Sequence, residues 1–544
     1  MIRKKILAGL LLCAGFLSAL IPVYADDVSD YAMAISQLPT ASYSDKAVIV
    51  RTLSGSHQSA TKDVLTALLD GNLYYRSSDA KVFIVTENGD QYQLRDAITL
   101  QDMGSAAADG FEKIGVNNQL RKTLRSAIAQ FDLNSSVVET RMDAVKEILR
   151  SLSDENAVLL GQRLKVETDG RVRTAIMTGL ALMDLESSDA DKRLAAVNAL
   201  SGNLSSDAYN RLSDLIKQND DGSFAEPDER VRIAARKVLN GIEHWKSTYS
   251  AGQTICFGLS LGAVLVLSAI GLAITFGVMG VINMAHGELM MLGAYATYVV
   301  QQLMPNHIGA SILVAIPAAF IVSGLVGVLI ERGLVRFLYG RPLETLLATF
   351  GVSLVLQQIV RDLFTANNRP VITPQWLSGS WQLNDYFALT YNRLYVILFT
   401  ALVFIALLVV LKKTTLGLNV RAVAQNRAMA RAMGVRSEWV DAMTFGLGSG
   451  IAGIAGVALS QLTNVGPNLG QQYIVDSFMV VVFGGVGNLW GTLISGMSLG
   501  VVNKLLEPYS GAVLAKIFVL IFLILFIQRR PRGLFPQRGR AAES

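Results

Sequence analysis

A series of long apolar runs fills the second half of this 544-residue chain and limits the folds open to it. Most runs approach or exceed the roughly 20 residues that a helix needs to cross a bilayer core about 30 Å thick. Nine runs can be delimited: residues 254–280, 285–302, 310–331, 343–361, 394–411, 440–462, 473–487, 491–506 and 512–528. The sequence therefore predicts an all-α, polytopic membrane domain over residues 252–536.

Basic residues predict the orientation of these runs. They follow the third, fifth and ninth runs: Arg332, Arg336, Arg341; Lys412, Lys413, Arg421, Arg427, Arg431, Arg436; Arg529, Arg530, Arg532, Arg538, Arg540. Loops rich in Lys and Arg stay in the cytoplasm, and nine crossings from an exported start place all three there. The seventh and eighth runs either cross or form a re-entrant pair around Gly484–Gly491, with the same orientation. The basic loops also account for the net charge of +5, so we do not expect a nucleic-acid partner.

The N-terminus has the pattern of a secretory signal peptide. Arg3, Lys4 and Lys5 precede an apolar run over residues 6–21, and Val23-Tyr24-Ala25 provides small residues at a cleavage site. We expect a leader over residues 1–25, cleaved after Ala25; an uncleaved anchor is the alternative. The domain that follows is then periplasmic.

The exported half is predicted to contain two regions. Residues 26–116 form a small α+β region, with helices near 45–53 and 61–69 and two strands flanking a turn at residues 88–90. Residues 117–248 are helical throughout, with apolar residues three and four apart, in the manner of a degenerate HEAT-like stack. This stack is either a docking surface for another exported protein or a spacer. Residues 537–544 form a cytoplasmic tail.

The segment Ile282–Leu289 holds the most informative polar residues of the membrane half. Between Ala251 and Leu303, Glu288 is the only formally charged side chain, and such a residue inside a membrane run is a functional candidate. Two interpretations remain open: a turn at the interface, or a broken helix that holds the segment deeper. The candidate substrate pathway comprises Asn283, His286, Glu288, Asp476 and Asn488.

A basic segment over residues 417–435 lies between the fifth and sixth runs. Alanines four residues apart give it a stripe of small side chains, and Gly434 suits a helix C-cap. The segment is either a helix on lipid headgroups or a helix inserted into a groove of a cytoplasmic ATPase. Candidate residues for the ATPase contact are Arg421, Ala424, Arg427, Ala428, Arg431 and Gly434.

Several ordered motifs together resemble the branched-chain amino-acid (LivH-like) permease family of ABC importers. They are Gly277–Glu288 as the first signature, Ile330-Glu331-Arg332 with Arg341-Pro342-Leu343 as the next inside loop, Thr415–Val435 as the coupling segment, and Phe483–Asn488 as the glycine-rich break. The resemblance covers residues 252–536. The leader and the helical extension depart from the usual member and resemble the family's urea-transporting branch.

The resemblance implies a permease subunit of an ATP-driven importer, for urea in the first place. Branched-chain amino acids or short amides are the alternative, and a passive channel and a membrane-anchored scaffold are rivals of other classes. The sequence has no Gly-Lys-Ser or Gly-Lys-Thr phosphate loop, so ATP is hydrolysed elsewhere; no catalytic residue, metal or cofactor is expected. The implied partners are two cytoplasmic ATP-binding subunits, a second, LivM-like permease, a periplasmic solute-binding protein and the lipid of the bacterial inner membrane.

Overall fold

The computed structural model describes residues 23–56, 58, 60–88, 91–150, 154–220 and 222–535. The chain divides into two compact units between Ile242 and Glu243. Most of the predicted leader and the predicted tail lie outside the described residues. The predicted cleavage site after Ala25 falls within helix α2 (Val23–Gln37) and stays a prediction.

The first unit begins with helices and a five-stranded antiparallel sheet of order β4-β3-β2-β1-β5. Its elements are α3 (Tyr43–Ser54), α4 (Thr61–Asp70), β1 (Leu73–Arg76), β2 (Val82–Asn88), β3 (Gln91–Asp96), β4 (Asp102–Ala107) and β5 (Phe111–Lys113). The hairpin predicted around residues 88–90 is confirmed, because β2 and β3 pair with Asn88 opposite Gln91. The other three strands were not predicted.

A stack of helices completes the first unit. It comprises α5 (Asn118–Asp132), α6 (Val138–Leu149), α7 (Asp154–Val166), α8 (Gly170–Asp184), α9 (Ala190–Ala199), α10 (Ser206–Leu215) and the start of α11 (Glu229–Met279). Helix α5 packs on α3, α4 and α6, and α8 packs on α6, α7 and α9. Leu120 and Leu124 of α5 belong to the same core as Leu65 and Leu68 of α4. The packing is therefore continuous across residue 117.

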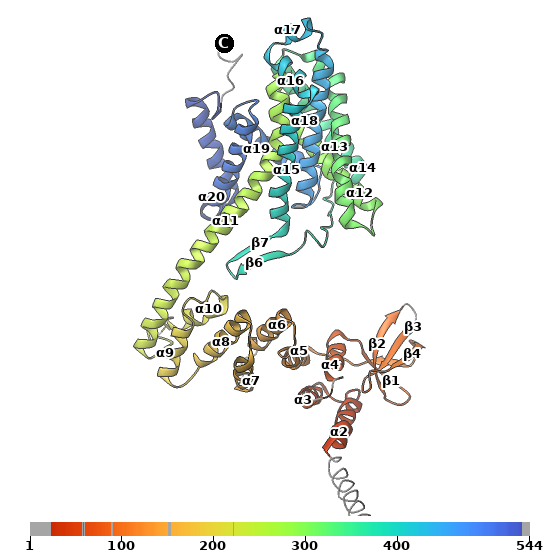
Figure 1. Cartoon of the computed structure of the whole chain (residues 1–544), viewed down its shortest axis with the longest axis vertical. Helices are drawn as coiled ribbons and strands as arrows, with labels where there is room; N and C mark the ends of the chain where they lie inside the picture. The colour runs from red at the N-terminus through yellow and green to blue at the C-terminus, as the bar shows by residue number, and fades with distance from the viewer. Residues whose placement is uncertain are drawn as a thin grey trace, which may run out of the picture. The chain divides into compact units, whose positions relative to one another are not determined.

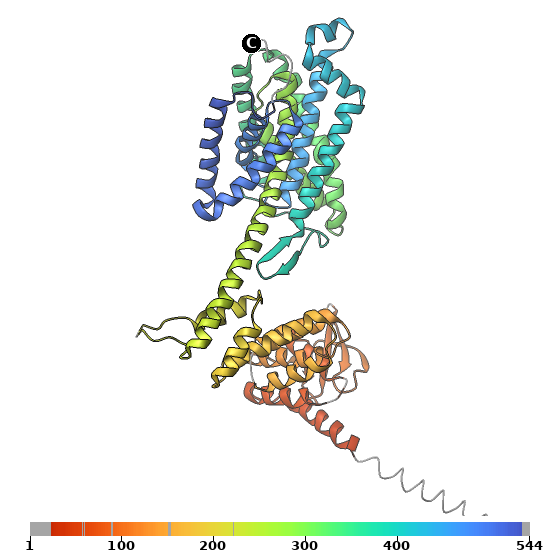
Figure 2. The ribbon, with the colours of Figure 1, turned by 60° about the vertical axis from the view of Figure 1, so that its left-hand side comes forward.

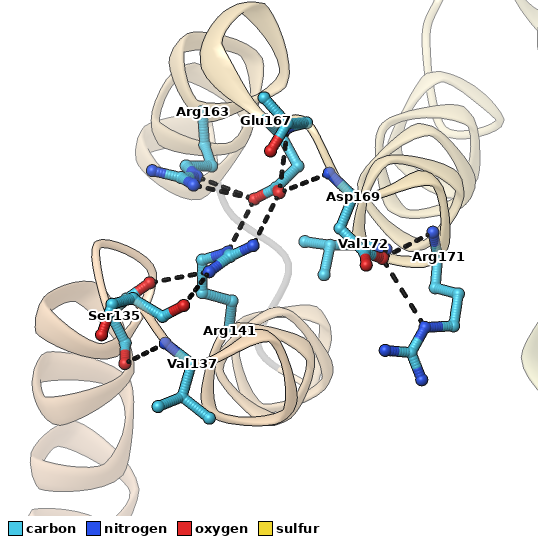
Figure 3. A network of polar contacts seen from close by, with 10 residues as sticks. Ser135, Val137, Arg141, Arg163, Glu167, Asp169, Arg171 and Val172 are labelled. Atoms are coloured by element: carbon cyan, nitrogen blue, oxygen red, sulfur yellow. Dashed lines mark hydrogen bonds and ion pairs between the residues drawn. The ribbon is translucent and has the colours of Figure 1, made fainter.

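A buried ion pair joins α6 to the turn before α8 (Figure 3). Arg141 donates from Nε and Nη2 to both carboxylate oxygens of Glu167, at 2.9 and 3.0 Å, and its Nη1 donates to the carbonyls of Ser135 and Ser136. Arg163 donates to the same carboxylate at 2.8 Å. Burial raises the pKa of Glu167, but these arginines and backbone N–H groups oppose it and bring the pKa down to about 2.

The same arrangement recurs further along the chain. Arg193 donates to both oxygens of Glu226, at 2.8 Å each, and to the carbonyls of Ser187 and Ser188. In each copy a Ser-Ser pair precedes the arginine by six and five residues, and the glutamate opens a Glu-x-Asp-x-Arg-Val-Arg segment. The stack therefore contains a structural repeat held by two equivalent arginine–glutamate clamps.

The second unit is a helical bundle. It contains the rest of α11, then α12 (His286–Leu303), α13 (Ile308–Gly333), η1 (Val335–Leu338), α14 (Pro342–Phe364), β6 (Ser380–Asn384), β7 (Phe387–Thr390), α15 (Tyr391–Lys413), α16 (Thr415–Gln425), α17 (Arg427–Ala432), α18 (Ser437–Ser460), α19 (Leu469–Gly484) and α20 (Leu489–Arg529). By length and composition, six helices in the described part of the chain can cross a membrane: α11, α13, α14, α15, α18 and α20. Most residues of each of the nine runs are helical, and α20 contains the last two runs on either side of Gly511. The seventh run departs from this at its end, because α19 stops at Gly484.

The basic loops lie together at one end of the bundle, called here the basic end. Arg336, after α13, forms an ion pair with Glu438 at the start of α18 at 3.2 Å. Arg421 of α16 lines a cavity with Asn488, and Asn488 donates to the carbonyl of Phe535 at 3.2 Å. Helices α16 and α17 mark this end, and the β6–β7 hairpin marks the opposite end (Figure 1, Figure 2). This arrangement agrees with the placement of all three basic loops on one side.

Candidate functional site

The candidate site is built on a helix that breaks and restarts inside the bundle. Helix α11 ends at Met279, and Gly280 adopts a φ of +68°, a left-handed conformation that glycine accepts without strain. Residues 281–285 are not helical, and α12 starts at His286. The chain therefore turns back after Gly280, and α12 restarts beside Ser268 of α11.

Contacts of His286 place this restart deep in the bundle. Its Nε2 lies 2.9 Å from the carbonyl oxygen of Ser268, so Nε2 carries the donated proton. Ser268 precedes the end of α11 by 11 residues, about 16 Å along the helix axis at 1.5 Å per residue. Since the hydrocarbon core is about 30 Å thick, this depth corresponds to about half the span. Of the two interpretations left open by the sequence, the structure contains the broken helix.

Glu288 is held by neutral donors from α14. Its Oε1 accepts hydrogen bonds from Ser353 Oγ at 3.0 Å and from Gln357 Nε2 at 2.7 Å. The residue is 1% exposed, and its Oε2 has no hydrogen-bond partner among the described residues. One carboxylate oxygen is thus fixed, and the other is free to accept.

Helix α14 presents an almost entirely polar buried face. Thr345, Thr349, Ser353 and Gln357 follow each other at intervals of four residues, and Val360 is the one apolar residue buried with them. Thr349 Oγ1 accepts from the backbone N–H of Met284 at 3.1 Å. This polar ladder, residues 345, 349, 353 and 357, therefore lines the broken segment. Polar groups in a membrane helix face the bundle interior or a water-filled path.

Helix α19 closes the other side of the broken segment. A Cβ atom on Gly287 would lie 2.4 Å from the carbonyl oxygen of Gly470, so the two backbones touch where no side chain fits. Further along α19, Ser477 Oγ donates to Ser268 Oγ at 2.8 Å. Asn283, His286 and Glu288 are therefore enclosed by α11, α14 and α19, and all three are fully or almost fully buried.

The other two pathway candidates lie apart from this cluster. Asp476 forms an ion pair with Lys516 of α20 at 3.1 Å. Asn488 is the N-cap of α20 and accepts from the N–H groups of Trp490 and Gly491 at 3.1 Å each. Asn488 also lines a cavity of about 340 Å³ at the basic end, together with Arg421 and Ala424. Asn488 therefore lines the same cavity as Arg421 and Ala424, two residues predicted for ATPase coupling.

The coupling segment is not the continuous helix that the alanine spacing predicts. Asn426 has extended backbone angles, ends α16, and caps α17 by accepting from Met429 N–H at 3.0 Å. Asparagine favours this cap because its side chain replaces the missing helical acceptor. The predicted stripe of Ala424, Ala428 and Ala432 on one helix is therefore wrong, because the helix breaks between the first two. The C-cap of α17 is Met433, and Gly434, with a φ of +87°, is the residue after it.

Two arginines of this segment, Arg427 and Arg431, contact the bundle. Arg427 forms an ion pair with the buried Asp441 of α18, and its guanidinium lies 3.9 Å from the ring centroid of Tyr339. Arg431 Nε donates to Ser437 Oγ at 2.6 Å. The opposite face exposes apolar side chains, with Met429 61% and Met433 78% exposed. Arg427 and Arg431 therefore fix α17 to the bundle, and the methionines are left for a partner.

Sequence reasoning missed the polar ladder of α14. A signal was present, because residues 345, 349, 353 and 357 are polar at a constant spacing of four within the fourth apolar run. The spacing of Ser353 and Gln357 matches one helix face. Within the described parts of residues 23–535, no group of three or more His, Cys, Asp or Glu side chains is placed to hold a metal ion.

A family model matches the second unit. Residues 254–527 match the family described as "Branched-chain amino acid transport system / permease component". Residues 1–253 lie outside this match. No solved structure is significantly similar to the chain.

Curated permeases are similar over the same length. The chain is 31% identical over 292 residues to the high-affinity branched-chain amino acid transport system permease protein LivH of Salmonella typhimurium, a match that covers 52% of this chain and 94% of that protein. It is 28% identical over 292 residues to the corresponding protein BraD of Pseudomonas aeruginosa, with 52% and 94% covered. The ribose import permease protein RbsC of Escherichia coli is 27% identical over 263 residues, with 44% and 74% covered.

Proposed function

The chain belongs to the branched-chain amino acid transport permease family, and we propose that it is the permease subunit of an ATP-driven importer of urea. The assembly comprises two cytoplasmic ATP-binding subunits, a second, LivM-like permease and a periplasmic solute-binding protein, in the bacterial inner membrane. The basic end faces the cytoplasm, and the first unit is periplasmic. The chain forms part of the solute pathway and performs no covalent chemistry.

The observation that carries the proposal is the hydrogen-bonding of Glu288 inside an apolar bundle. Oε1 accepts from two neutral donors, Ser353 and Gln357, and Oε2 has no partner among the described residues. Urea has four N–H donors and one carbonyl acceptor, so it can donate to the free carboxylate oxygen. The second N–H of the Gln357 amide can offer it a donor in exchange. A path of this kind suits a small neutral solute, because each hydrogen bond lost in leaving water is replaced.

Coupling to ATP hydrolysis is assigned to α17 and its flanking residues. The exposed face of Met429 and Met433 is an adaptable apolar surface of the kind that enters a groove on another protein. Arg427, bound to Asp441 and Tyr339, transmits the movement of that partner to α18 and to the end of η1. Closure of the ATP-binding subunits then moves α18 against α12 and α13, on which it packs. The solute pathway changes the side to which it opens.

The first unit gives additional support to the assignment of urea. A leader and a helical extension over residues 26–248 resemble the urea-transporting branch of the family, and the family match does not extend into them. The helical stack has two equivalent clamps that stiffen it. A stiff helical stack offers an extended surface, and we assign it to docking of another exported component.

Import of branched-chain amino acids is the second candidate. The names of the LivH and BraD relatives describe that transport. One observation on this chain favours it: Arg361 follows Gln357 by one helical turn on α14, and Gln357 donates to Glu288 of α12, so a guanidinium lies near the Glu288 carboxylate. Opposite charges so placed could pair with the two charges of an amino acid.

Uptake measurements separate the candidates. Labelled urea and labelled leucine are offered in turn to vesicles that hold the reconstituted complex, with and without ATP. We expect ATP-dependent accumulation of urea and none of leucine. Glu288→Gln should reduce urea uptake, whereas Glu344→Gln, at an exposed position of α14, should leave it unchanged. ATP-dependent leucine uptake without urea uptake would establish the second candidate in place of the first.

A further inference from the structure

A polar cavity opens beside the loop that joins α18 to α19. Its volume is about 300 Å³, at the lower end of the range of about 300–1,000 Å³ for small-molecule sites. The lining includes Asn368, Thr463, Asn464, Gly466, Asn468 and Gln472, and none of the lining residues carries a formal charge. We call it the amide cavity, because four of these side chains are primary amides.

The four amide side chains have hydrogen-bond donors and acceptors that no other residue of the described chain uses. Asn468 Oδ1 accepts from Arg361 Nη2 at 2.8 Å, which leaves the NH2 group of this side chain as a donor. Among the described residues, no hydrogen-bond partner is found for the side-chain amides of Asn368, Asn464 and Gln472. Each primary amide offers two N–H donors and a carbonyl acceptor. The cavity can therefore satisfy both kinds of group on one small solute.

A glycine maintains the shape of the cavity wall. A Cβ atom on Gly466 would lie 2.0 Å from Asn368 Oδ1. Val465, the preceding residue, is fixed by a backbone bridge to Arg369, with N···O distances of 2.7 and 3.0 Å. The two chain segments that form the cavity are thus tied together, and the absence of a side chain at residue 466 lets Asn368 lie where it does.

The amide cavity adjoins the broken segment. Asn468 immediately precedes α19, and Gly470, two residues later, touches Gly287 across a backbone contact. Beyond that contact lie Glu288 and the polar ladder. Arg361, which binds Asn468, is one turn beyond Gln357 on α14. The cavity and the Glu288 cluster are therefore neighbouring polar sites, separated by the Gly287–Gly470 contact.

We propose that the amide cavity is a binding site for a small neutral amide of the urea class, occupied before the solute passes the Gly287–Gly470 contact. This inference rests on the proposed function and adds the place where this chain first binds the solute. Neutral amides bind urea through both its N–H and its carbonyl groups. A zwitterion finds no opposite charge among the lining residues, so it loses hydration without a compensating ion pair.

Protection of an introduced thiol tests this site. Gln472→Cys is made in a Cys256→Ser background, in the full chain within its reconstituted complex, and its reaction with a membrane-impermeant thiol reagent is followed. Gln471→Cys, exposed on the same helix but outside the lining, is the matched control, and Asn464→Cys is the second test position. The protectants are urea, acetamide and leucine, at concentrations below those that unfold proteins.

We expect urea and acetamide to slow the reaction of the Gln472→Cys and Asn464→Cys thiols and leucine to have no effect. Simple competition predicts that ten times the half-protecting urea concentration slows the reaction about elevenfold. The Gln471→Cys thiol should react at an unchanged rate. Equal slowing of all three variants, no slowing by urea, or protection by leucine alone would overturn the inference.

The same vesicles separate this inference from the proposed function. ATP-driven urea uptake by the unsubstituted complex is measured alongside the labelling. Uptake without protection refutes the amide cavity as a urea site and leaves the transport function intact. Protection without uptake refutes urea transport while the binding site stands.

Discussion

Replacing Arg141 by methionine should lower the free energy of local unfolding of the helical stack around α6 and α8. The substitution keeps a side chain of similar length but leaves the Glu167 carboxylate buried without its bidentate partner. Breaking a buried ion pair by removing one partner costs about 3–5 kcal/mol. Arg163 still donates to Glu167 at 2.8 Å, which places the expected loss at the lower end, about 3 kcal/mol.

The pH dependence gives an independent value for the same clamp. The pKa of Glu167 falls from its ordinary 4.5 to about 2 in the folded chain, which corresponds to about 3 kcal/mol. Because the folded-state pKa is the lower one, this stability is fully present above pH 4.5. It is lost progressively as the pH falls from 4.5 towards 2.

Hydrogen exchange of the full chain measures both effects locally, in the amides of α8. Arg141→Met should raise the exchange of these amides by a factor that corresponds to about 3 kcal/mol, roughly 150-fold. Arg171→Met is the control, because its ion pair with Glu139 is exposed on both sides and such pairs contribute about 0–1 kcal/mol. Equal exchange in the two variants, or wild-type protection that is constant from pH 6 to pH 3 after correction for intrinsic rates, would refute the reasoning.

Three further predictions concern the second unit. Gly287→Ala should abolish uptake, because its Cβ would lie 2.4 Å from the carbonyl oxygen of Gly470. Gly351→Ala is the control: its Cβ would meet open space, so uptake should be unchanged. Gln357→Leu should reduce uptake at least about tenfold by removing a 2.7 Å hydrogen bond to Glu288, whereas Gln358→Leu, at an exposed position, should not. Arg427→Ala should lower solute transported per ATP hydrolysed, measured in the reconstituted complex; an unchanged ratio would exclude it from coupling.

Much of the second unit could be predicted because bilayer physics leaves few choices. The lengths of the apolar runs predict the helices, and the positions of Lys and Arg predict which loops share an end. Gly446 and Gly450 illustrate the packing that follows: Cβ atoms there would lie 2.7 Å from Val328 and 2.6 Å from Phe320 of α13. Small residues four apart permit such close helix contact.

Other features depend on contacts between segments distant in the sequence. The local sequence does not distinguish an interfacial turn at residues 282–288 from a broken helix. The depth of this segment depends on contacts with distant residues: the hydrogen bond of His286 to Ser268 and the hydrogen bonds that Glu288 accepts from α14. The break at Asn426 has a local signal, because asparagine is a common N-cap residue. The four-residue spacing of the alanines led us to predict one continuous helix there instead. Strands β1, β4 and β5 are three to six residues long, too short for a clear alternation of polar and apolar residues.

The most direct test of the account asks whether solute movement requires the ATP-binding subunits. Vesicles are prepared with this chain and its partner permease, first alone and then with the ATP-binding subunits, the solute-binding protein and ATP enclosed on the cytoplasmic side. We expect urea accumulation against a gradient only in the complete assembly, and its loss when ATP is replaced by a non-hydrolysable analogue. Rapid, nucleotide-independent equilibration of urea through this chain alone would contradict it and identify a passive channel.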